Sequence, residues 1–148
     1  MSKTPKIVAI LLYVAGALLL VGGAGTWYTV SNQLAAENIT VTEDASCQQG
    51  QAVNGPLEAF CMAEIINDHA LESTGGKTYA ELDREDPLRA VAQSASFLRA
   101  SLFTSVVAFG VAAFAMGMGI VTLLAGAGIS ALNRRTAIAP AKDTVPVA

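Results

Sequence analysis

Two long apolar segments dominate the hydrophobic pattern of the chain. Ile7 to Val30 and Leu102 to Leu132 contain no Asp, Glu, Lys, Arg or His. An uncharged apolar run of about 18 residues or more is long enough to cross the ~30 Å hydrocarbon core of a bilayer as a helix. We therefore predict an all-α membrane protein. Its transmembrane helices, at 7–30 and 102–132, are expected to form an antiparallel hairpin that carries a small, mainly helical lobe at 31–101.

Small residues follow one face of each apolar segment, every seven residues in the first and every three or four in the second. Lipid provides no hydrophobic force between helices, so small side chains are what allow close backbone approach. The predicted helix-packing residues are Ala9, Gly16, Gly23, Ser105, Ala108, Ala112, Ala115, Gly119, Thr122 and Gly126. This stripe faces either the chain's own first helix or a partner subunit, although Ala and Gly are also common in membrane helices generally. The neighbouring stripe of the second segment is mostly bulky and includes Phe109.

The helical pattern of the second segment begins upstream of the apolar run. Asp86 followed by Pro87 is typical of an N-cap and a first helical turn, and apolar residues continue from there with helical periodicity. A helix from Pro87 to about Leu132 would be roughly 69 Å long at ~1.5 Å per residue. We therefore expect part of it to project beyond the bilayer.

Charge is distributed unevenly and predicts the orientation. All but one of the 12 acidic residues lie in 31–101, whereas five of the nine basic residues lie toward the termini. Lys and Arg close to the spans favour the cytoplasmic side. We therefore predict a plasma-membrane protein with a cytoplasmic N-terminus at 1–6, an extracytoplasmic acidic lobe at 31–101 and a disordered cytoplasmic tail at 133–148. A cleaved signal peptide is the alternative for the first span, but its apolar run exceeds a typical h-region.

The predicted lobe contains further local signals. Ser31–Glu37 is expected to prolong the first helix, and residues 39–42 alternate as a short strand does. Apolar spacing predicts a helix over Leu57–Leu71, ended by the glycine pair at 75–76 through C-cap geometry.

Cys47 and Cys61 are the only cysteines. A small lobe buries a thin core and commonly needs a covalent link, and both cysteines lie on the side that we assign to an oxidising compartment. We predict a disulfide bond between them, worth about 3 kcal/mol by the loop-entropy relation. The alternative is two free thiols, with Cys61 buried in its helix.

The side chains in the sequence argue against a catalytic, cofactor-binding or metal-binding site. Neither span contains an Asp, Glu, Lys, Arg or His, which pumps would require. The single histidine, His69, cannot by itself form a zinc or iron site, which needs several such ligands. We interpret His69 as an exposed or capping residue near a helix end. The acidic residues at 81–86 lack the order of an EF-hand loop, and phosphate loops, nucleophile elbows and nucleic-acid patches are missing from the sequence. We therefore expect no catalytic, cofactor-binding or metal-binding residues, no small-molecule substrate and no nucleic acid.

Several stretches resemble a family of small actinobacterial two-span membrane proteins. They are QLAAENITV at 33–41, GPL at 55–57, HAL at 69–71, GGKTYAEL at 75–82 and ASFLRASLFTSVVAFGV at 95–111. Members of this family are often labelled aromatic ring-opening dioxygenases. Extradiol ring cleavage uses iron held by two histidines and a carboxylate, which one histidine cannot supply. The family has no established catalytic residues to carry over, and its looser members often lack the cysteine pair.

These observations lead to two hypotheses for function. The first is a non-catalytic accessory or assembly subunit of a larger envelope membrane protein complex, with membrane lipids and that complex as partners. The setting of the family suggests a respiratory supercomplex as the host. The second is a self-associating structural or stress-related envelope membrane protein without a fixed host complex.

Overall fold

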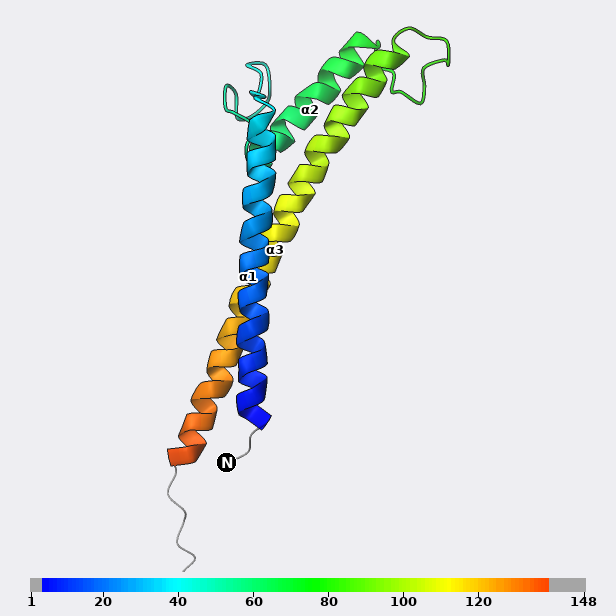
Figure 1. Ribbon diagram of the computed structural model, residues 1–148. Coiled ribbons are helices and arrows are strands. Elements are labelled where there is room, and N and C mark those ends of the chain that lie inside the picture. Colours follow the sequence, from blue (N-terminus) through cyan, green and yellow to red (C-terminus); the bar gives the residue numbers. More distant parts are fainter. Residues whose placement is uncertain (1–3, 139–148) are drawn as a thin grey trace, which may run out of the picture. The chain divides into compact units, whose positions relative to one another are not determined.

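The structure is a computed structural model that describes residues 4–138, with side chains described as far as Arg135. Within these residues there are three helices and no strand: α1 (Thr4–Ala36), α2 (Pro56–Ser73) and α3 (Arg89–Ile138) (Figure 1). The all-α prediction is therefore confirmed for this part of the chain. Both α1 and α3 are long and apolar enough to cross a membrane.

The chain divides into two compact units. Among the described residues, unit 1 consists of 4–22 and 115–138, and unit 2 consists of Gly23–Phe114. Unit 1 contains the first part of α1 and the last part of α3. Unit 2 contains the remaining parts of these helices, all of α2 and the connecting segments. The boundaries between the two units fall inside the predicted spans. The boundaries predicted for the lobe, at residues 31 and 101, concern placement in the membrane and stay predictions.

Helix α1 contains the predicted span and continues beyond it. Pro5 is tolerated in the first turn because the N–H that proline lacks would have no helical partner there. At the other end, the Glu37 N–H donates to the Leu34 carbonyl at 3.1 Å, and Asn38 has a left-handed φ of 52° that ends the helix. The expected extension of the first helix over residues 31–36 is confirmed.

Helix α3 begins close to the predicted start and ends later than predicted. The Leu88 N–H donates to the Asp86 carboxylate at 2.9 Å, which is the N-cap contact that the Asp-Pro pair indicates. The tail predicted from residue 133 is wrong for 133–138, which are helical. These residues include no Gly or Pro, extending an existing helix costs little, and Arg135 in the last turn suits the helix dipole. The rest of the predicted tail, 139–148, lies outside the described residues.

Helix α2 confirms the predicted helix and its end. Gly55 is the N-cap residue, and Pro56 occupies the first turn. After the helix, Gly75 has φ +64°, and the Gly76 N–H donates to the Leu71 carbonyl at 2.7 Å. The Gly75 N–H reaches the Glu72 carbonyl at 3.3 Å, which completes a Schellman motif.

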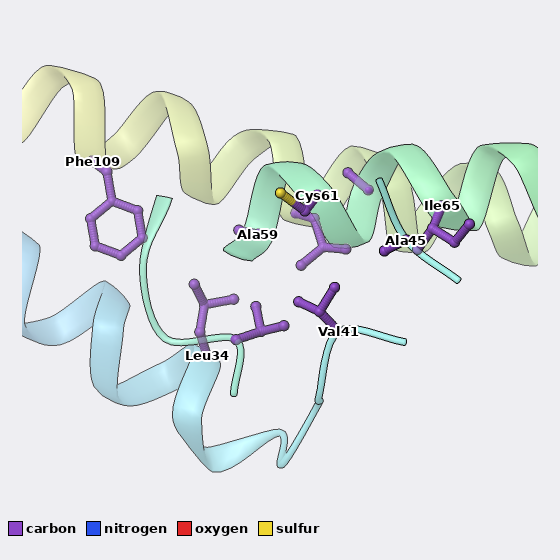
Figure 2. Close-up of a cluster of buried hydrophobic side chains, with 10 residues drawn as sticks. Leu34, Val41, Ala45, Ala59, Cys61, Ile65 and Phe109 are labelled. Atoms are coloured by element: carbon purple, nitrogen blue, oxygen red, sulfur yellow. The ribbon is translucent and has the colours of Figure 1, made fainter. Parts of the chain in front are cut away.

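The core of unit 2 lies where α1, α2 and α3 meet the segment between α1 and α2. Figure 2 shows the labelled side chains of this cluster, Leu34, Val41, Ala45, Ala59, Cys61, Ile65 and Phe109. The strand signal at 39–42 produces only an antiparallel bridge between Thr40 and Ala52. The chain turns at once through residues 43–50, where Gln48 and Gly50 have positive φ, so the pairing cannot lengthen.

Candidate functional site

The predicted small-residue stripe is a helix-packing seam in unit 1. A Cβ atom on Gly119 would lie 2.8 Å from the carbonyl oxygen of Gly16, and one on Gly16 would lie 2.9 Å from the carbonyl oxygen of Gly119. Farther along, a Cβ on Gly126 would lie 3.4 Å from the carbonyl oxygen of Ala9. The residue numbers of the contacts increase along α3 as they decrease along α1, so the two segments run antiparallel in this unit. Of the two alternatives left open by the sequence, these contacts favour packing against the chain's own first helix.

The other predicted packing residues are also turned inward within their own units. Ala112 is 1% exposed and Gly23 is buried, while Ser105, Ala108, Ala115 and Thr122 are half-buried. The hydroxyl groups on this face bond to their own helix: Ser105 donates to the Ser101 carbonyl at 3.2 Å and Thr122 to the Met118 carbonyl at 2.6 Å. Close backbone approach, and not hydrogen bonding by these hydroxyls, is therefore what the stripe contributes.

In unit 2 the face of α3 that packs on α1 is not small throughout. Phe109 is 1% exposed, and its ring meets Trp27 edge-on with centroids 4.8 Å apart. The sequence pattern placed Phe109 on the bulky stripe beside the small one and did not predict that Phe109 packs against α1. Leu102 and Phe109 are both buried and seven residues apart, which is the signal that could have placed Phe109 inward. Trp27 packs on this ring instead of pointing away from the protein like Tyr28, which is 71% exposed.

A covalent link, an ion pair and a contact between His69 and Asp44 join the polar segments of unit 2. Cys47 and Cys61 are disulfide-bonded with Cα atoms 5.7 Å apart, as predicted, so residues 43–50 are fastened to α2. Arg99 of α3 reaches Glu64 of α2 at 3.4 Å and lies over the Phe103 ring, 5.3 Å from its centroid.

His69 makes the contact with Asp44. Its Nε2 atom lies 2.5 Å from a carboxylate oxygen of Asp44, and both side chains are about half exposed. Contacts with the Thr42 side chain and then with His69 hold the pKa of Asp44 below its ordinary value of 3.8. The interpretation of His69 as an exposed residue near the end of a helix is confirmed, but its partner comes from a distant segment that local spacing could not reveal.

A mainly apolar groove of about 490 Å³ lies between α2 and α3 in unit 2. Ile66 and His69 line one wall, and Val91 and Leu98 line the other. Val91 and Leu98 are 46% and 53% exposed and lie two helical turns apart, so they project from one side of α3. Sequence reasoning missed this groove because helical periodicity identifies the apolar positions without showing which of them lack a neighbour.

Among residues 4–138, no group of three or more His, Cys, Asp or Glu side chains is placed to hold a metal ion. The expected absence of metal, cofactor and catalysis stays a prediction. Comparisons of the chain with protein-family models, with curated proteins and with solved structures find no match.

Proposed function

We propose that the chain is a two-span membrane protein that serves as a non-catalytic accessory or assembly subunit of a larger envelope complex. The outward faces of the two long helices support the membrane placement. Leu18, Val21 and Leu124 are 66–73% exposed, and in the most apolar window of each helix only 17% of the residues are buried. An apolar surface of this extent is costly in water, whereas lipid covers it without cost.

The proposed topology is a hairpin with both termini in the cytoplasm and residues 31–101 outside. Lys6, Arg134 and Arg135 flank the spans on the terminal side, which favours the cytoplasm. The bond between Cys47 and Cys61 suits an oxidising compartment on the other side. In intact cells, a membrane-impermeant thiol reagent should label these cysteines only after reduction. Labelling that also requires cell lysis would place the lobe inside and refute the topology.

The groove between α2 and α3 is the surface that we propose binds a partner subunit. Leu98 adjoins Arg99, whose ion pair with Glu64 belongs in water and not in hydrocarbon. Helix α3 has 50 residues and is therefore about 75 Å long, more than twice the hydrocarbon thickness, so this part has room to project. Lipid would then leave Val91 and Leu98 uncovered, and exposed apolar patches in water mark protein interaction sites. An apolar helix of a partner subunit is the occupant that such a groove accepts.

Affinity purification tests the proposal. A tagged chain expressed at its native level should be recovered in mild detergent with other membrane proteins in near-stoichiometric amounts. Leu98→Asn should lose most of them, because a buried amide without a partner weakens the contact. Leu57→Asn is the matched control, since Leu57 is 62% exposed on α2 and does not line the groove.

Three outcomes decide the matter. Loss with Leu98→Asn alone supports the accessory role. Equal recovery with both variants refutes the groove as the contact. Recovery of the wild-type chain only with copies of itself refutes the accessory role and favours the self-associating alternative. The family resemblance adds a respiratory supercomplex to the proposal as host, and recovery of respiratory-chain subunits in the same purification tests that addition.

A further inference from the structure

A cavity of about 390 Å³ lies in unit 1, between the first turns of α1 and the last described turns of α3. Two cationic side chains line it from opposite helices, Lys6 on α1 and Arg134 on α3. Two hydroxyl groups also line it, one from each helix, and the Tyr13 hydroxyl reaches the Ser130 hydroxyl at 3.4 Å. The cavity thus combines positive charge with hydrogen-bonding groups, which is the chemistry that recognises a phosphate group.

The charges of this cavity have no carboxylate to neutralise them among the described residues of unit 1. The stretches 4–22 and 115–138 contain no Asp or Glu at all. Two cations held near each other without an acidic neighbour repel one another, and a bound anion relieves that repulsion. The occupant is therefore expected to be anionic.

The apolar part of the wall indicates where the anion comes from. Ile10 lines the cavity and is 59% exposed, and Val14, one turn farther along α1, is 53% exposed. An apolar strip thus begins at the cavity and continues along the helix. A free phosphate ion has nothing to place on such a strip, whereas the acyl chain of a phospholipid does.

We infer that this cavity binds the headgroup phosphate of an anionic phospholipid, with Lys6 and Arg134 on the phosphate and an acyl chain along Ile10 and Val14. The inference rests on the proposed membrane placement, in which these cations lie at the cytoplasmic headgroup level. The bound lipid would link the two ends of the hairpin at that surface, and it requires no partner complex.

Native mass spectrometry of the purified chain with added phosphatidylglycerol, phosphatidylcholine or inorganic phosphate tests the inference. The wild-type chain should retain phosphatidylglycerol more than phosphatidylcholine, and inorganic phosphate should not displace it. Each cation near an anionic headgroup changes affinity about fivefold, so the double variant Lys6→Gln/Arg134→Gln should bind about thirtyfold more weakly. Arg135→Gln is the matched control, because it removes a neighbouring cation that does not line the cavity.

Equal retention of the two lipids, or an equal loss with Arg135→Gln, would overturn the inference. Displacement by inorganic phosphate would indicate a free-anion site and overturn the lipid assignment. These outcomes leave the accessory role intact, because the measurement uses the purified chain alone. A chain that proves water-soluble and monomeric without detergent would instead refute the membrane placement itself.

Discussion

Replacing Gly119 by alanine should force the two helices of unit 1 apart. The new Cβ would lie 2.8 Å from the carbonyl oxygen of Gly16 and 2.9 Å from the Leu20 side chain, whereas ordinary contact begins at 3.4 Å. The carbonyl oxygen belongs to a helix backbone and cannot rotate away, so the helices must separate by several tenths of an ångström. Overpacking of this kind costs about 1–3 kcal/mol, and a gap of ~0.5–1 Å forfeits about a quarter to a half of each neighbouring dispersion contact.

Gly117→Ala is the matched control on the same helix. A Cβ at Gly117 meets nothing within 4 Å. Both substitutions replace glycine in a helix interior and so share a gain of about 0.5–1 kcal/mol from chain entropy. The difference in stability between the two variants isolates the packing cost. We expect Gly119→Ala to be about 1–3 kcal/mol less stable than Gly117→Ala.

An engineered cross-link measures this difference in unit 1. A Cβ at Gly126 would lie 3.3 Å from the Leu12 Cβ, close to the ~3.8 Å usual in disulfides, so Leu12→Cys/Gly126→Cys should cross-link only while the helices are packed. Each variant is oxidised briefly in mild detergent at increasing SDS content. The midpoint is the SDS content at which half of the cross-linking is lost. A midpoint for Gly119→Ala equal to or above that of Gly117→Ala would refute the close glycine contact.

Three further predictions concern unit 2 and use the fluorescence of Trp27, the only tryptophan. Cys61→Ser should lower the free energy of unfolding by about 3 kcal/mol, and an unchanged denaturant midpoint would contradict this. Phe109→Ala should lower the free energy of unfolding by about 3–5 kcal/mol and shift the Trp27 emission to the red. Phe114→Ala, at a 69% exposed position, should do neither. The lowered pKa of Asp44, caused by its contacts with the Thr42 side chain and with His69, contributes stability that is present above pH 3.8 and is lost as the pH falls through the folded-state pKa. Asp44→Asn should flatten this acid-induced loss, and an identical pH profile would count against the contact between Asp44 and His69.

The features that the sequence predicted correctly depend on neighbours along the chain. Periodicity and the absence of charge identified both long helices, the Asp86-Pro87 pair located the start of α3, and the glycine pair after α2 ended that helix. The disulfide was predicted from the small size of the lobe and from the oxidising compartment assigned to both cysteines. The helical spacing of small residues likewise identified which face of each helix packs inward.

Tertiary structure decided which residue each inward position meets. The paired approach of Gly16 and Gly119, the ring of Phe109 against Trp27, and the contact of His69 with Asp44 all join segments far apart in the sequence. The groove between α2 and α3 arises in the same way, because a hollow exists only once two elements have packed. Local spacing fixes the direction of a side chain from its own backbone, whereas its partner depends on where the rest of the chain folds, so the helices were readable from the sequence and their contacts were not.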